Sequence, residues 1–380
     1  MDFALTEDQA SLRDLATQIL MDRSTDETLK AFTGDDRPFD DALWATLAEA
    51  GLLGTAIPEA QGGLGLGLFE LGLLLEAQGR TLAPVPLHAT LVAGALPIAA
   101  FGNEAQRALL RQVAAGRLIL TAALEEVGNH DPVSPMLRAT RSGNGWSLDG
   151  SKTAVSYGAQ AGRIIVPARS AEGVIVFLVD PATPGIEIAA QQTTSSEPQA
   201  EMIFRAASVS GDDVLGTVEQ GAEIARWIVD RARAGLVALQ VGICGEALKR
   251  TAAYSSERVQ FGKPLGSMQA VQHRAADGFI DVEAMRSAWL RAAWLLDQGV
   301  DAPGEVETAK YWAAIGGHRV SHSAQHLHGG IGADMDYPIH RYFLAAKQVE
   351  LALGGAQPML AAIGREIAAG TTMKLAGERT

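Results

Sequence analysis

Apolar side chains recur at spacings of three and four residues along most of this chain, which is the pattern of amphipathic helices. The most regular stripe starts at Val271 and continues to Leu296. Near the start of the chain, Thr6-Glu7-Asp8-Gln9 is a capping box, and a helical stripe follows it. The pattern predicts helices throughout residues 1–118, and again in four segments near 223–254, 268–298, 303–326 and 338–370.

The pattern changes between about residues 119 and 222, where short apolar runs alternate with turn residues. Residues 146–155 read as a hairpin around an Asp149-Gly150 turn. Strands this short and without intervening helices predict a small β-barrel or sandwich. The sequence therefore predicts an α+β chain of three domains, which are all-helical (1–118), β (119–222) and a helical bundle (223–380).

The composition is that of a globular protein, because 47% of the 380 residues are hydrophobic and 20% are charged. The formal net charge of −13 argues against nucleic acid or an anionic membrane as the main partner, since both bind basic surfaces. No apolar run reaches about 18 residues, and the first residues lack a signal pattern. We therefore expect a cytoplasmic protein without a membrane span.

Cys244 is the one cysteine of the sequence and lies in an apolar helical run. A single thiol can form neither an internal disulfide nor a cysteine-ligated metal cluster. We therefore expect Cys244 to pack in the core, and we expect no metal site.

Two glycine-containing loops are candidates for ligand binding. Phe261-Gly262-Lys263-Pro264 follows Arg258, and a guanidinium beside a glycine turn suits a phosphate-bearing ligand. The alternative is a solvated arginine at a corner between two helices. The second loop, residues 58–65, lacks the order of a phosphate-binding loop, and we interpret it as a connection.

Residues 257–273, ERVQFGKPLGSMQAVQH, resemble the signature of the acyl-CoA dehydrogenase family. MDFALTEDQ, GLLGTAIPEAQGGLG, GWSLDGSK, DDVLG and HLHGGIG resemble further family landmarks and follow the family's order. The resemblance implies an N-terminal helical domain, a middle β-barrel or sandwich and a C-terminal four-helix bundle. It also implies FAD as cofactor and an acyl-CoA thioester as substrate. In this reaction a carboxylate removes the α-proton, and the flavin accepts the β-hydrogen as hydride.

The resemblance also implies which residues would contact FAD. Arg258 and Phe261 would grip the cofactor, often across a subunit interface. Ser156 would hydrogen-bond near flavin N5, whereas Leu124 replaces a flavin-bonding threonine. The remaining candidates are Gln325 and His326 before a glycine turn, Gly329 and Gly330 in that turn, and Gln357.

The catalytic carboxylate is missing from both places where the family carries it. Leu353 occupies one position and Ala232 the other, and neither side chain can accept a proton. Asp336 and Glu350 are substitute candidates, although each is more simply a solvated charge. His326 and His328 are either polar turn residues or flavin contacts. Arg233 is a candidate for the substrate site, or else a partner of Asp230 in a structural ion pair.

The leading hypothesis is an FAD-dependent acyl-CoA dehydrogenase-like subunit whose base comes from a paralogous subunit, as in bacterial heterotetramers for steroid or other cyclic acyl-CoA substrates. An electron-transfer flavoprotein or a similar acceptor would then take the electrons. One alternative is a non-catalytic homo-oligomer, such as a homotetramer, that binds FAD or a CoA ester. The other is a different flavin reaction on the same fold, such as nitroalkane oxidation or monooxygenation.

Overall fold

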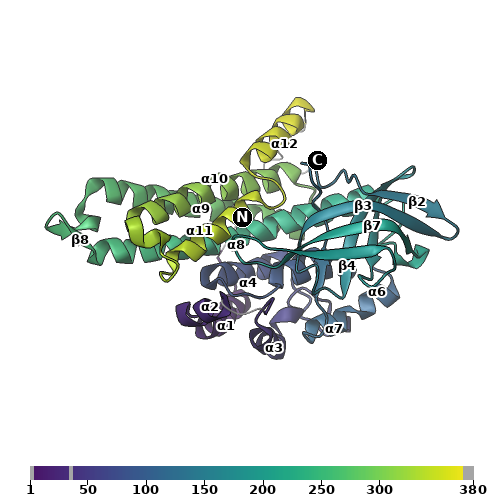
Figure 1. Ribbon diagram of the computed structural model, residues 1–380, viewed down its shortest axis with the longest axis horizontal. Helices are drawn as coiled ribbons and strands as arrows, with labels where there is room; N and C mark the ends of the chain where they lie inside the picture. Colours follow the sequence, from purple (N-terminus) through teal and green to yellow (C-terminus); the bar gives the residue numbers. More distant parts are fainter. Residues whose placement is uncertain (1–3, 34–36, 371–380) are drawn as a thin grey trace.

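The computed structural model describes residues 4–33 and 37–370 of the chain. The expected order of a helical region, a β region and a helical bundle is confirmed, and Figure 1 shows the sheet at one end of the bundle. Residues Met1, Asp2 and Phe3 of the expected N-terminal landmark lie outside the described residues. The boundaries of the three domains stay a prediction.

The N-terminal region is helical, as the apolar spacing predicts. Its helices are α1 (Glu7–Arg23), α2 (Asp26–Thr33), α3 (Asp41–Glu49), α4 (Leu68–Thr81), the π-helical segment η3 (His88–Ala95), α5 (Leu96–Phe101), α6 (Glu104–Ala108) and α7 (Leu110–Ala114). Thr6 and Gln9 form the predicted capping box at the start of α1. The glycine-rich loop at 58–65 packs closely, since a Cβ on Gly63 would lie 2.0 Å from the carbonyl oxygen of Ile57.

The middle region is one curled sheet in the order β1-β4-β2-β3-β7-β6, with β5 paired to β4. Its strands are β1 (Leu120–Ala122), β2 (Arg138–Ser142), β3 (Gly145–Ser156), β4 (Arg163–Ser170), β5 (Gly173–Val179), β6 (Ile186–Gln191) and β7 (Gln199–Val209). The core of the sheet contains a buried ion pair, in which Lys152 Nζ lies 2.7 Å from Glu126 Oε1. Burial raises the pKa of Glu126, but the Lys152 ammonium and backbone N–H donors outweigh that effect and hold it below its usual value.

The predicted hairpin at Asp149-Gly150 is wrong. Both residues lie inside the single strand β3, where the pairing register with β7 shifts between Leu148 and Gly150. The side chain of Asp149 accepts the backbone N–H of Ala206, and this contact stabilises the bulge. The tight turn comes earlier, at Gly143 and the residue after it, between the paired ends of β2 and β3. The Asp-Gly pair forms a β-bulge here. A bulge and a tight hairpin turn both need the backbone freedom of glycine, so the same two residues fit either structure.

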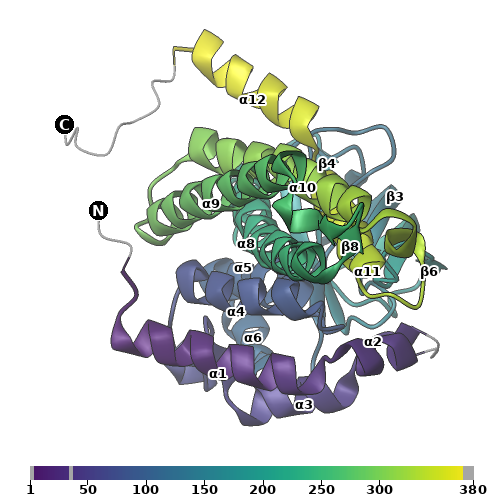
Figure 2. The same ribbon diagram turned by 90° about the vertical axis from the view of Figure 1, so that its left-hand side faces the viewer.

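The C-terminal region is built on three long helices, α8 (Gly221–Glu257), α9 (Gln269–Asp297) and α10 (Pro303–His328). The segment predicted as one helix near 338–370 is instead α11 (Ile339–Leu351) and α12 (Ala356–Ala368). They are separated by a turn in which Leu353 has φ 52° and Gly354 has φ 102°. Figure 2 shows α1 and α4 on one side of the bundle and α12 on the opposite side.

Cys244 is fully buried on α8, as expected, and burial raises the pKa of its thiol. Among the described residues, no helix is long and apolar enough to cross a membrane.

Candidate functional site

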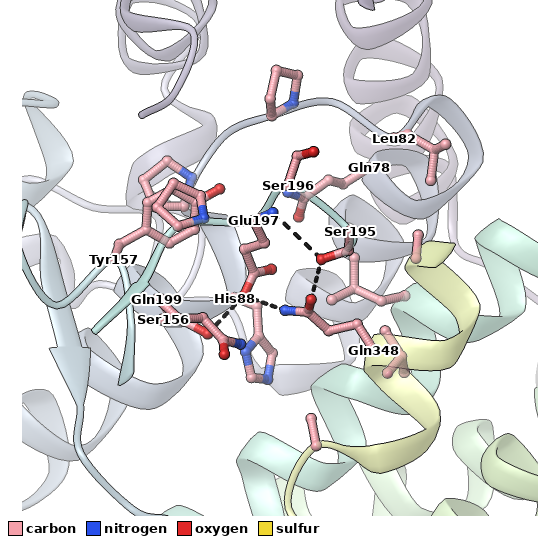
Figure 3. Close-up of a pocket in the computed structure, with 18 of the residues that line it drawn as sticks. Gln78, Leu82, His88, Ser156, Tyr157, Ser195, Ser196, Glu197, Gln199 and Gln348 are labelled. Carbon is pink, nitrogen blue, oxygen red and sulfur yellow. Dashed lines mark hydrogen bonds between the residues drawn. The ribbon is translucent and has the colours of Figure 1, made fainter. Parts of the chain in front are cut away.

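A cavity of about 270 Å³, here called the central pocket, lies where the three regions meet. The N-terminal helices, the ends of β1 and β3, the loop between β6 and β7, and helices α8 and α11 all contribute to its wall. Most of the wall is aliphatic, and a few polar groups converge in it (Figure 3). A largely apolar cavity with convergent polar groups is the usual form of a small-molecule site.

Both sequence positions where a catalytic carboxylate was sought line the central pocket. Ala232 faces it from α8, and Leu353 faces it from the turn between α11 and α12. The carbonyl oxygen of Ala232 lies 2.8 Å from His88 Nε2. The structure therefore brings the two positions together, and neither places an ionisable side chain in the pocket.

Glu125, at the end of β1, also lines the pocket and was not among the candidate bases. Its carboxylate accepts the backbone N–H of Leu353. Arg233 Nε donates to the carbonyl oxygen of Leu353 over 3.1 Å, so the two charged groups hold the same residue from both sides. Burial raises the pKa of Glu125, while the Leu353 N–H and the charges of Lys310 and Arg233 oppose the rise.

Lys310 holds the same turn in place, because its ammonium group donates to three backbone carbonyls. The acceptors are the carbonyl oxygens of Val349 at 3.0 Å, Glu350 at 3.1 Å and Gly354 at 2.9 Å. This turn is thus held by the charged side chains of Glu125, Arg233 and Lys310, of which Arg233 and Lys310 are buried. Its non-glycine residue at φ 52° adds strain, since the left-handed region costs about 1 kcal/mol or more for such a residue.

A second unexpected carboxylate, Glu197, lies at the centre of the pocket (Figure 3). Ser156 Oγ donates to Glu197 Oε1 over 2.7 Å, and Gln348 Nε2 donates to the same oxygen over 2.8 Å. The side chain of Gln199 is a third donor to this carboxylate. We call these four residues the Glu197 network. Burial raises the pKa of Glu197, against its three neutral donors.

The two substitute bases considered from the sequence do not reach the pocket. Asp336 pairs with Lys30 at 2.6 Å on the surface. Glu350 pairs with Lys347 at 2.6 Å and with His318. Neither carboxylate is among the residues that line the central pocket, so both expectations give way to Glu125 and Glu197.

The signature loop forms a second, separate surface at the far end of the bundle from the sheet (Figure 1). The strands β8 (Val259–Gln260) and β9 (Lys263–Pro264) form a small hairpin around Phe261 and Gly262. The Phe261 side chain is 90% exposed, although its backbone has an unfavourable φ of 53°. A strained backbone that presents an apolar ring to solvent is typical of a contact surface for a ligand or a partner.

The glycine turn after α10 lies at the same end of the bundle. His328 stacks on Tyr254 near the end of α8, with 4.4 Å between ring centroids. Gly329 has φ 65°, and neither it nor Gly330 has an atom within 4 Å of an added Cβ, so their backbone faces open space. We call the residues here that were expected to bind FAD the hairpin end, and they are Arg258, Phe261, Gln325, His326, Gly329 and Gly330.

The expected FAD residues therefore fall into two groups that the structure does not bring together. The hairpin end fits an anionic cofactor, because an exposed arginine, an exposed ring and open glycine backbone lie side by side there. Ser156 instead lies in the central pocket, where its hydroxyl is already bonded to Glu197. Gln357 is exposed on the first turn of α12. The residues expected to bind FAD thus do not form one continuous site within the chain.

Arg233 Nε donates to the carbonyl oxygen of Leu353, and the charges of Arg233 and Asp230 also act on each other. Arg233 also lines a smaller cavity of about 100 Å³ with Arg226, Arg365 and Glu307. Burial raises the pKa of Asp230 to about 6 and that of Glu307 to about 7. The role of Arg233 in substrate binding stays a prediction, and its observed role is to hold the turn.

Sequence reasoning missed Glu125 and Glu197 for different reasons. Glu125 follows a short strand and could have been flagged as an acid at the end of a candidate flavin-contact strand. Glu197 lies in the stretch Thr-Thr-Ser-Ser-Glu-Pro, which has the composition of a solvated loop. Nothing local to that stretch indicates that its carboxylate turns inward.

Comparisons with known proteins agree across nearly the whole chain. Residues 6–117 match the family model described as acyl-CoA dehydrogenase, N-terminal domain, and residues 219–368 match acyl-CoA dehydrogenase, C-terminal domain. The chain is 38% identical to acyl-CoA dehydrogenase FadE27 of Mycobacterium tuberculosis, over 97% of this chain and 99% of that protein.

Two solved structures are similar over the same extent. A variant of the steroid ACAD Tcur3481-Tcur3483 has a TM-score of 0.91 and 44% identity, covering 96% of this chain and 98% of that chain. The ChsE4-ChsE5 complex from Mycobacterium tuberculosis has a TM-score of 0.91 and 39% identity, covering 97% of this chain and 99% of that chain.

Proposed function

This chain belongs to the acyl-CoA dehydrogenase family of CH–CH oxidoreductases, and we propose that it works as one of two unlike subunits in such an enzyme. In this proposal its hairpin end helps to hold an FAD whose flavin lies in the pocket of a paralogous partner. The partner supplies the carboxylate that takes the α-proton. FAD, when bound, supplies the hydride acceptor.

The observation that carries the proposal is the separation of the hairpin end from the central pocket. The small hairpin of β8 and β9, which follows Arg258 and encloses Phe261, lies at the end of the bundle away from the sheet (Figure 1). Ser156 is the last residue of β3 and lines the central pocket. A cofactor gripped by Arg258 cannot also place its flavin beside Ser156 of the same chain. Such a grip is useful only to a pocket that belongs to another subunit.

The chemistry of the central pocket supports the same conclusion. Its base positions are Ala232 and Leu353, and the nearby Glu125 is engaged by the Leu353 N–H and flanked by two buried cations. A general base must have a lone pair free to reach the substrate proton. A carboxylate that holds the backbone of its own turn is poorly placed for that work.

The names of the similar structures suggest the substrate class. One is a steroid ACAD named for two gene products, and the other is a complex of two different chains. We therefore propose a steroid-derived or other polycyclic acyl-CoA as the substrate. An electron-transferring flavoprotein or a similar acceptor is the proposed recipient of the electrons.

Co-expression with a paralogous acyl-CoA dehydrogenase gene from the same genomic neighbourhood tests this proposal. We expect a stable complex that contains FAD and oxidises an acyl-CoA with an artificial acceptor, whereas each chain alone is inactive. In the complex, Arg258→Ala should lower the affinity for FAD by about tenfold or more, as expected for loss of a charge-assisted contact. Lys249→Ala, which removes an exposed cation from the same helix, is the matched control. Activity and full flavin content in this chain alone would contradict the proposal.

A second candidate function follows from the position of Glu125 in the pocket wall. If substrate binding freed its carboxylate from Leu353, Glu125 could remove a proton in this chain's own pocket. The candidate predicts turnover by the isolated chain that Glu125→Gln abolishes in a variant that is still folded. Absence of turnover in the wild-type chain excludes it.

A further inference from the structure

We infer that Glu197 takes the position that a flavin ring would need in this chain's central pocket, so that this pocket accepts no FAD. The inference rests on the proposed function and deepens it. It assigns one FAD to each pair of unlike chains, and it names the residue that excludes the second.

The argument begins at Ser156, the pocket residue expected to bond the flavin edge. Its hydroxyl donates to Glu197 over 2.7 Å, so the donor that should meet the ring is already used (Figure 3). Gln348 on α11 donates to the same carboxylate from the opposite wall. The Glu197 network therefore bridges the sheet and the bundle across the pocket, along the path that a planar ring would have to take.

The loop that carries Glu197 is built to hold the carboxylate inside. Thr193 Oγ1 donates to the carbonyl oxygen of Glu197 over 2.9 Å, and the Tyr157 N–H donates to the carbonyl oxygen of Pro198 over 2.8 Å. Ser196 has φ 65°, a left-handed backbone that turns the chain just before Glu197. Ser195 adds a contact to Gln348. The carboxylate is thus directed inward by its own loop rather than left there by chance.

The hydrogen bonds of Glu197 add to the steric exclusion. The donors to Glu197 are the neutral side chains of Ser156, Gln199 and Gln348, and no ion pair is recorded for it among the described residues. A flavin ring placed against Glu197 would separate this buried carboxylate from its donors, and a buried polar group that loses its hydrogen bonds costs free energy.

The remaining space is also too small for the full set of reactants. The central pocket has about 270 Å³, whereas cavities that hold one drug-sized molecule measure about 300–1,000 Å³. A dehydrogenase needs room for a tricyclic ring and an acyl group side by side. With Glu197 in place, the pocket has room for one of these at most.

The test measures binding of riboflavin, which has the isoalloxazine ring but no phosphates and so does not need the hairpin end. Fluorescence quenching is followed in the full-length chain alone, in the wild type and in the Glu197→Ala variant. We expect the Ala variant to bind riboflavin about tenfold or more tightly than the wild type, since the side chain that obstructs the ring is removed. Glu197→Gln keeps the bulk of the side chain, so the central pocket of this variant should still exclude riboflavin.

Controls separate a pocket effect from a general one. Glu187→Ala removes a carboxylate from the outer strand β6, where it pairs with Arg205, and should leave riboflavin binding at the wild-type level. Thermal unfolding checks that each variant is folded. If Glu197→Ala does not fold, Glu197→Ser, which keeps a polar atom for Gln348, takes its place.

The FAD content of the complex with the partner chain gives the second readout. We expect one FAD per pair of chains for the wild type and more than one when this chain carries Glu197→Ala. Equal riboflavin affinity in the wild type and the Ala variant, with one FAD per pair in both complexes, would overturn the inference and leave the proposed function standing. Two FAD per pair in the wild-type complex would overturn both.

Discussion

The carboxylate of Glu125 accepts the backbone N–H of Leu353, which lines the central pocket from the turn between α11 and α12. This turn has a left-handed backbone and is held by charged side chains, and the side chain that it presents to the pocket is apolar.

Removing Glu125 should destabilise the protein rather than a reaction. Glu125→Ala leaves the Leu353 N–H, Arg233 and Lys310 without their carboxylate, and we expect a loss of about 3 kcal/mol of unfolding free energy. Glu125→Gln keeps the acceptor oxygen and should cost about 1 kcal/mol. Urea unfolding of both variants gives the comparison. Equal free energies of unfolding for the two variants would show that the hydrogen bond from Leu353 to Glu125 does not contribute to stability.

The buried pair Lys152–Glu126 should be a large contributor to the stability of the sheet. Lys152→Met leaves a buried carboxylate with its backbone donors but no cation, and we expect a loss of about 3–5 kcal/mol. The double variant with Glu126→Gln should recover part of that loss, since no buried charge remains. A double-mutant cycle by chemical denaturation measures the coupling. Additive effects would contradict a direct interaction.

The pH dependence of stability should carry the signature of Glu307. Its pKa is about 7 in the folded protein against 4.5 for the free side chain, so the folded state binds the extra proton between these values. Stability should therefore fall as the pH rises from about 4.5 to about 7. We expect Glu307→Gln to remove about 2 kcal/mol of that fall. Parallel stability curves for the two proteins from pH 5 to pH 8 would refute the assignment.

The local patterns of this sequence predict most of its elements. The capping box at Thr6 and the stripe that begins at Val271 mark true helices, because both signals depend on residues three and four apart. The prediction of a hairpin turn at Asp149-Gly150 was wrong, since a glycine that permits a turn equally permits a bulge within a strand. The helical pattern also does not predict the turn at Leu353 between α11 and α12. This turn depends on tertiary contacts from Lys310 and Arg233, which the local sequence does not show.

The site was less predictable than the fold for the same physical reason. Leu353 and Ala232, the two positions at which a base was expected from the resemblance, both line the central pocket, although they are 121 positions apart in the sequence. Glu197 could not be placed, because its environment is made by Ser156 and Gln348 from other elements. A carboxylate in a polar loop has no local signal that separates an inward from an outward side chain.

The most direct test of the account compares the FAD content of two complexes with the partner chain, one carrying Arg258→Ala and the other Ser156→Ala. Arg258 lies at the hairpin end and Ser156 in this chain's own pocket, so the two variants ask which of them the cofactor uses. The account predicts that Arg258→Ala lowers FAD retention by about tenfold or more, and that Ser156→Ala leaves it unchanged. Loss of FAD in the Ser156→Ala complex, with full retention in the Arg258→Ala complex, would contradict it.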